Sequence, residues 1–299
     1  MSILVVGSVA IDSVKTPFGK RDEALGGSAT FFSVAASFFC KVRIIATVGR
    51  DFPKKYFDLF RKRSIGIEGL HAVDGKTFRW KGVYDFDLNT AHTIYTRLNV
   101  FKDFKPEIPD TLKKSPILFL ANIDPELQYG VLGQMSGQRL VACDSMNYWI
   151  THKKRAFEKV VKKVDILLLN DAEARQFTGR SSLMRAAREL VSMGPKAVVI
   201  KKGEHGVIYF SKNSHFIAPA YLLDDVYDPT GAGDTFAGGM MGYLSRSRRI
   251  DEPSIRKSII YGSVLASFAV EDFSVDRLLK LSFADIVARY RHFEKITKF

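Results

Sequence analysis

The sequence has few cysteines, no long apolar run and no segment typical of secretion. Its two cysteines, Cys40 and Cys143, stand far apart in apolar stretches without metal-ligand spacing, which argues against a disulfide framework and predicts reduced core thiols. No apolar run approaches the ~18 residues that a membrane helix needs, so we expect no membrane partner. Residues 1–10 are apolar but lack a basic start and a small-residue cleavage pattern, which predicts a first core strand in a cytoplasmic protein.

Acidic residues are scarce relative to basic ones. The chain has 45 lysines and arginines against 32 aspartates and glutamates, a formal net charge of +13 at pH 7. Such a charge raises the alternative of a nucleic-acid binder. However, the basic residues lie in small groups without a long basic tail or the motif of a known binding module. We therefore expect no nucleic-acid partner, because anionic ligands in a cleft are a sufficient reason for a positive field.

Internal repeats, low-complexity segments and long linkers are absent as well, so we expect one α/β domain over residues 1–299. Apolar strand-like runs alternate with helical stretches, which predicts βαβ units in a mostly parallel sheet with helices on both faces. The expected strands are 3–7, 42–48, 117–121, 139–143, 166–169, 197–200 and 207–210, and the clearest helices are 28–39, 53–63, 153–162 and 182–193. Ligands of such sheets bind beyond the carboxyl ends of the strands, where we find Asp12, Asp144, Asn170 and Lys201.

One region, residues 72–101, breaks the alternation of strands and helices. Its two runs, 77–86 and 93–100, alternate polar and apolar residues on either side of a polar turn. A period of two is typical of strands, so this region is predicted to form a β-hairpin.

The most informative segment is 228–239, which reads DPTGAGDTFAGG. The apolar residues after it have helical spacing, so the small residues form a turn that opens a helix. Gly231 and Gly233 lack a Cβ, so backbone N–H groups at the start of this helix are able to close around an anion. Asp234 lies in the same first turn, where it is either a base beside a phosphate or a simple helix cap.

This segment resembles the C-terminal signature of the ribokinase-like (PfkB) carbohydrate kinase family, which transfers the γ-phosphoryl group of ATP to an alcohol. Gly26 and Gly27, before a run of small residues, resemble its N-terminal signature. Asn170 and Glu173 match its Asn-x-x-Glu element. The resemblance implies a ribokinase-like three-layer α/β/α core with a mostly parallel sheet, plus a small β lid formed by residues 13–25 and 72–100.

The resemblance also implies catalytic roles for the turn. Asp234 would accept the proton of the attacking hydroxyl group, and the N–H groups of Gly231, Ala232 and Gly233 would form the anion hole.

ATP and Mg²⁺ are the implied cofactors. Lys201 and Gly203 match positions that line the nucleotide in relatives, with a solvated lysine pair as the alternative. Asn170 and Glu173 would hold Mg²⁺ largely through water, or they would only cap a helix with an acidic first turn.

The resemblance also bears on whether a monovalent cation binds beside the anion hole. Asp228 and the carbonyl of Thr230 match positions that help to hold potassium in many relatives. However, Phe273 stands where the family usually has glycine, so both outcomes, potassium activation and its loss, remain open.

The acceptor site is implied by the first signature. Asp12, Gly26, Gly27 and Ser28 resemble a site in which a carboxylate accepts hydrogen bonds from vicinal hydroxyl groups; alternatively, Asp12 closes a loop. Phe31 stands where ribose kinases have asparagine, which disfavours ribose.

The predicted protein is therefore an ATP-dependent kinase that phosphorylates a hydroxyl group of a small sugar or polyol. A nucleoside kinase is the alternative, because Phe31 and the hairpin aromatics Phe78, Trp80 and Tyr84 are able to stack on a base. A non-catalytic regulatory or nucleic-acid-binding protein is disfavoured by the intact base and anion hole. A homodimer through the β lid is the other use of an exposed hairpin.

Overall fold

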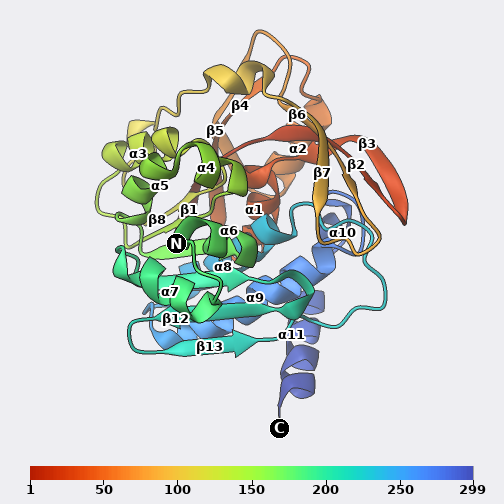
Figure 1. Cartoon of the computed structure of the whole chain (residues 1–299). Helices are drawn as coiled ribbons and strands as arrows, with labels where there is room; N and C mark the ends of the chain where they lie inside the picture. The colour runs from red at the N-terminus through yellow and green to blue at the C-terminus, as the bar shows by residue number, and fades with distance from the viewer. Residues whose placement is uncertain (299) are drawn as a thin grey trace.

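A central sheet of nine strands organises the computed structural model, which describes residues 1–298 (Figure 1). From one edge to the other, the strands are β13 (His215–Ala218), β12 (Val207–Ser211), β11 (Ala197–Lys201), β10 (Ile166–Asn170), β9 (Leu140–Cys143), β8 (Ile117–Leu120), β1 (Ser2–Val6), β4 (Lys41–Gly49) and β5 (Ile65–Val73). Within this nine-stranded sheet, only the pairs β11–β12 and β12–β13 are antiparallel. The predicted mostly parallel α/β sheet is confirmed.

Strand β1 shows why helices cover both faces of this sheet. Successive side chains of a strand point to opposite faces, so Ile3 and Val5 enter one hydrophobic core and Leu4 and Val6 the other. The first core is covered by α1 (Ser28–Ala36), α2 (Lys54–Lys62), α8 (Ala232–Arg246), α9 (Glu252–Ala269), α10 (Asp276–Leu279) and α11 (Phe283–Thr297). The second is covered by α3 (Pro125–Gln134), α4 (Asn147–His152), α5 (Lys154–Val161), α6 (Asp171–Thr178) and α7 (Leu183–Ser192).

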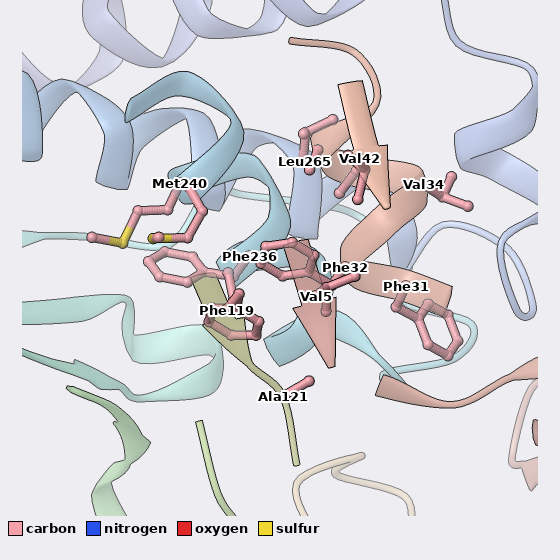
Figure 2. Close-up of a cluster of buried hydrophobic side chains, with 14 of the residues drawn as sticks. Val5, Phe31, Phe32, Val34, Val42, Phe119, Ala121, Phe236, Met240 and Leu265 are labelled. Atoms are coloured by element: carbon pink, nitrogen blue, oxygen red, sulfur yellow. The ribbon is translucent and has the colours of Figure 1, made fainter. Parts of the chain in front are cut away.

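The first core holds the helix that carries the predicted anion site. In Figure 2, Phe236 and Met240 of α8 lie in one cluster with Phe32 of α1 and Phe119 of β8. The rings of Phe32 and Phe119 are stacked, with centroids 4.1 Å apart. Phe31, the residue before Phe32, points away from this cluster, because neighbouring residues on a helix face different directions. Helices α1 and α8 are thus held against the sheet, and their first turns lie at the same end of it.

A second sheet, drawn in red and orange at the upper right of Figure 1, has four strands in the order β3-β2-β6-β7. Its strands are β2 (Ala10–Thr16), β3 (Gly19–Gly26), β6 (Arg79–Tyr84) and β7 (Ala91–Arg97). β6 and β7 are antiparallel and form the predicted hairpin, and β2 runs parallel to β6. Whether the whole chain acts as one domain with this sheet as its lid stays a prediction.

Three short 3₁₀ helices complete the described structure: η1 (Asn99–Asp103), η2 (Asp110–Leu112) and η3 (Gly203–His205). Within residues 1–298, no helix combines the length and apolarity needed to cross a membrane.

Candidate active site

The carboxyl ends of β9, β10 and β11 bring three of the polar residues together. Asp144 follows β9, and the register of β10 with β11 places Asn170 opposite Lys201. The Lys201 ammonium forms an ion pair with Asp144, and only 17% of the Lys201 side chain is exposed. Burial lowers the pKa of Lys201, but the carboxylates of Asp144 and Glu173 outweigh it, so that the pKa lies above its ordinary value. Lys201 is therefore a buried, charged group, and the solvated alternative is wrong for it.

The predicted turn opens α8 beside this lysine. Gly231 precedes the helix with φ 75°, a left-handed conformation that glycine adopts without strain. A Cβ built on Gly233 would lie 3.1 Å from the Nζ atom of Lys201, so the ammonium points at the start of the helix. The N–H group of Ala232 donates to the Pro229 carbonyl at 3.1 Å, so of the three N–H groups at positions 231–233 only those of Gly231 and Gly233 lack such a partner within residues 1–298. These two donors lie beside a cation, which is an arrangement suited to phosphate.

Asp234 is the third residue of α8, and it does not cap the helix, because no side chain makes a capping bond there. Burial first, and then the charge of Asp144, raise the pKa of Asp234 to about 7, while the Lys201 ammonium opposes this rise. A carboxyl group with such a pKa is close to half ionised at neutral pH. Asp234 is therefore able both to accept a proton and to release it, as a general base must.

Asn170 and Glu173 form a capping box at the start of α6. The Asn170 Oδ1 atom accepts from the Glu173 N–H at 2.7 Å, and Glu173 Oε2 accepts from the Asn170 N–H at 2.8 Å. Burial, followed by the charge of Asp144, raises the pKa of Glu173 to about 7. The helix-capping alternative is thus present in the structure. The other carboxylate oxygen of Glu173 takes no part in these two hydrogen bonds.

The acceptor side of the site is built around Asp12 on β2. Its carboxylate lies directly on Gly26, where a Cβ would come within 1.9 Å of the Asp12 Oδ2 atom. The same oxygen accepts a hydrogen bond of 3.3 Å from the N–H of Gly27. Burial raises the pKa of Asp12 to about 7, and the nearby carboxylates of Asp228 and Asp234 add to this rise. Asp12 and Asp234 are therefore close enough to influence each other's ionisation.

Two predicted residues have structural contacts of their own. The Ser28 hydroxyl group lies 3.1 Å from that of Ser8 and donates to the carbonyl of Asn122 at 3.4 Å, which ties the start of α1 to the end of β1. Gly203 begins η3, and the tip of the β6–β7 hairpin lies over it, with Asn89 Oδ1 3.8 Å from a Cβ built there. The hairpin therefore reaches the side of the site that was expected to hold the nucleotide.

One contact across the site was missed by the sequence patterns. The Thr230 hydroxyl group donates to the Tyr84 oxygen at 3.3 Å, which joins β6 of the small sheet to the anion turn. Burial raises the pKa of Tyr84 to about 12, so its hydroxyl group stays neutral. Aromatic residues at alternate positions of the predicted strand were the available signal. Such a pattern does not predict which residues the face of the strand contacts.

The space between the small sheet and the turn is nearly closed. It measures about 10 Å³ and is lined by Asp12, Phe31, Asp228 and Thr230 among others. Since a single water needs about that volume, no sugar fits in this conformation without movement of the walls. The ring of Phe31 covers Gly231, where a Cβ would lie 2.4 Å from it, so Phe31 forms an apolar wall. Phe78 stacks on Phe101 with ring centroids 5.5 Å apart, so one face of its ring is already in contact, and its expected stacking on a base stays a prediction.

The predicted cation residue Asp228 ties two loops together. Its Oδ1 atom accepts from the Thr230 N–H at 2.9 Å, and its Oδ2 atom accepts from the Ser274 N–H at 3.2 Å. Phe273, beside Ser274, is buried and approaches Gly19 of the small sheet. Both carboxylate oxygens of Asp228 therefore already have backbone donors.

A mostly parallel α/β sheet with a glycine turn, a buried carboxyl group and an ammonium group at the carboxyl ends of its strands is an arrangement that suits a phosphotransferase. Residues 2–280 match the model of the pfkB family carbohydrate kinases, so the chain belongs to that family and is an ATP-dependent kinase. A cytidine kinase of Thermococcus kodakarensis is 30% identical over 256 residues, which are 84% of this chain and 91% of that protein.

Solved structures with the same fold include two nucleoside kinases. The enzyme of Methanocaldococcus jannaschii has a TM-score of 0.79 at 20% identity, over 97% of this chain and 98% of that one. The Burkholderia thailandensis enzyme in complex with inosine has a TM-score of 0.79 at 19% identity, over 97% of each chain. The predicted ribokinase-like α/β fold is confirmed, and so is the prediction of a small-molecule kinase.

Proposed function

We propose that this kinase phosphorylates a hydroxyl group of a nucleoside, the second of the two acceptor classes that the sequence predicts. The observation that carries the proposal is the register of β2 with β6, which pairs Asp12 with Trp80. Residues paired in this way lie on the same face of a sheet. One face of the small sheet thus offers a carboxylate for the hydroxyl groups of a ribose and an indole ring for a base.

The Trp80 ring is positioned to stack on a base. A Cβ built on Gly82 would lie 2.2 Å from the ring, so the indole lies along the strand over a residue without a side chain. Its Nε1 atom donates to the Thr93 hydroxyl group at 3.2 Å, which holds the ring in that orientation. Tyr84, two residues beyond Gly82, extends the same face to the anion turn. Names of similar proteins, a cytidine kinase and two nucleoside kinases, favour the same acceptor class.

The chain's own residues would position the two substrates and accept the proton. The γ-phosphoryl group would lie at the N–H groups of Gly231 and Gly233 with Lys201 beside it, where developing negative charge is stabilised. Asp12 would orient the acceptor through its hydroxyl groups. Asp234 would accept the proton of the attacking hydroxyl group as the new bond to phosphorus forms. The small sheet would exclude water, because an exposed phosphoryl donor would hydrolyse.

Mg²⁺ fits this site as a partner of ATP. Three carboxyl groups, those of Asp144, Glu173 and Asp234, interact with the single ammonium of Lys201; burial first, and then like charge, raises the pKa of Glu173 and that of Asp234 to about 7. A polyphosphate entering such a site needs a further positive charge. Glu173 would hold the ion through water, since one of its oxygens is used by the capping box. The ion would neutralise charge on the phosphate oxygens.

Potassium should not activate this enzyme. Because backbone N–H groups already bond both oxygens of Asp228, the loop geometry that a cation would impose is present without one. We expect kcat/KM to change less than about twofold when potassium replaces tetramethylammonium at constant ionic strength. Steady-state assays in the two salts test this, and a tenfold activation by potassium would assign Asp228 and Thr230 to a cation site instead.

The acceptor class is tested by a panel of nucleosides, free ribose and inositol in a coupled assay of ADP release. We expect kcat/KM for the best nucleoside to exceed that for ribose by at least ~100-fold. Trp80→Leu should raise KM for that nucleoside by ~10-fold, the scale of one lost base-stacking contact, with a smaller change in kcat. Tyr95→Leu is the matched control, because Tyr95 pairs with Lys81 on the opposite face of the sheet. Preference for ribose or inositol, or equal effects of the two variants, would contradict the proposal.

Two further sequence predictions stay proposals. The edge strands β3 and β7 carry exposed residues, which is compatible with a homodimer through the small sheet. A cytoplasmic location would give the enzyme its ATP.

A further inference from the structure

A second hollow lies at the opposite end of the helices that open the active site. It measures about 350 Å³ and is lined by Phe39, Tyr243, Arg246, Ser247, Tyr261 and Phe283. This volume is within the usual range of small-molecule sites. α8 begins at the anion turn and ends at Arg246, so the 15 residues of the helix separate the hollow from the turn by roughly 22 Å. The hollow is therefore distinct from the active site.

Flat aromatic rings form most of its walls. Tyr243 stacks on Tyr261 with centroids 4.6 Å apart, and Tyr261 stacks on Tyr290 at 4.5 Å. Phe39 meets Tyr261 edge-on at 5.5 Å and Phe283 at 5.8 Å. Both faces of the Tyr261 ring are covered by Tyr243 and Tyr290, so the other lining rings, Phe39, Tyr243 and Phe283, are the contact surfaces for another ring system. Planar, aromatic ligands are therefore the chemistry that these walls favour.

The charges at this hollow are positive. Arg246 lines the hollow and lies 5.7 Å from the centre of the Phe283 ring. Lys257 does not line it, but its ammonium lies 5.9 Å from the centre of the lining ring of Tyr243. Neither cation forms an ion pair with any residue of the described chain, 1–298. The acidic residue nearest in sequence to Phe283, Asp285, is engaged by the N–H and hydroxyl groups of Ser282. The positive charges are thus available to an anion.

We propose that this hollow is a second nucleotide site, in which a base packs among the aromatic rings and a phosphate group meets Arg246 and Lys257. The combination of planar walls with two uncompensated cations matches a ligand that has both parts. It does not match a base or a phosphate alone. The proposal is independent of the acceptor class, because none of these residues lies at the active site.

Isothermal titration of the full chain with ADP tests the proposal. We expect two equivalents of ADP to bind the wild-type protein and one to bind Arg246→Glu, whose kcat and KM for ATP should stay within about twofold of wild type. Arg248→Glu is the matched control, because Arg248 is an exposed neighbour that does not line the hollow; it should keep both equivalents. At the second site, measured as the binding that Arg246→Glu removes, adenosine and inorganic phosphate should each bind at least tenfold more weakly than ADP.

Phe283→Ala provides a second variant, since Phe283 is 40% exposed and its loss should not unfold the chain. It should weaken the second equivalent at least tenfold. One equivalent of ADP in the wild-type protein, or two in Arg246→Glu, would overturn the site. Tighter binding of a short single-stranded oligonucleotide than of ADP, lost in Arg246→Glu, would overturn its assignment to a small ligand. Loss of nucleoside turnover with both equivalents intact would affect only the proposed function.

Discussion

Asp234→Asn should lower kcat by at least ~100-fold, which is the scale of losing a positioned general base. The KM for ATP should stay within about threefold, because asparagine keeps the shape of the side chain beside Lys201. Steady-state kinetics with the best acceptor measure both quantities. Glu126→Gln is the control, since Glu126 is an exposed acid in the first turn of α3; it loses charge at a helix start and a surface ion pair with Lys153, and it should keep wild-type kcat. A loss below tenfold in Asp234→Asn would remove Asp234 from the role of base.

The pH dependence of this reaction follows from the same carboxyl group. Asp234 acts only when ionised, and its pKa is about 7, so kcat/KM should rise with pH up to neutrality and then level off. Asp12 and Glu173 have pKa values of about 7 as well, so the acidic limb should be steeper than a single ionisation gives. The residual activity of Asp234→Asn should show a shallower limb. A pH profile of both proteins from pH 5 to 9 measures the difference.

Stability should respond to pH in the opposite direction. A carboxyl group whose pKa is raised by folding binds its proton more tightly in the native state. Its contribution to stability is present below the unfolded pKa, near 3.8, and is lost as the pH rises through about 7. Asp234→Asn removes the carboxyl group whose ionisation causes this loss of stability. Its Tm at pH 8 should therefore equal or exceed that of the wild-type protein, whereas a helix cap would show a lower Tm.

Gly233→Val should lower kcat by ~100- to 1,000-fold, the range found for losing one donor of an anion hole. A Cβ at this position lies 3.1 Å from the Lys201 Nζ atom, so the two methyl groups of valine would enter the space proposed for the phosphoryl group. The lysine would also be displaced from its position beside Asp144. Single-turnover measurements at saturating ATP would show whether the chemical step is slowed.

Gly130→Val controls for the cost of valine in a helix. Gly130 lies in α3 with nothing within 4 Å of a Cβ built there. The two variants should have Tm values within a few degrees of each other, while only Gly233→Val loses turnover. If Gly233→Val keeps wild-type kcat, the anion hole lies elsewhere.

The elements that local sequence patterns predict correctly are those that depend on neighbouring residues. The Gly-rich turn and the start of α8 were predictable, because backbone freedom and helical spacing are properties of a short segment. The β6–β7 hairpin was predictable from its period of two. β5 and β13 were not predicted. β5 contains two glycines, and β13 is a partly exposed edge strand, so neither shows the apolar run that marks the equally short but buried strands β8 and β9.

Side-chain partners across the sheet edge required the tertiary structure. Alternation of strands and helices placed Asp144 and Lys201 at one edge, but their ion pair joins residues 57 positions apart. Tyr84 meets Thr230 across 146 positions. Such contacts depend on which way each side chain points and on what the packing leaves open, and neither is encoded in a local period. Local patterns were therefore sufficient for the glycine turn and for the place of Asp234 in the first turn of α8, whereas the long-range packing of the small sheet decided the shape of the proposed acceptor site.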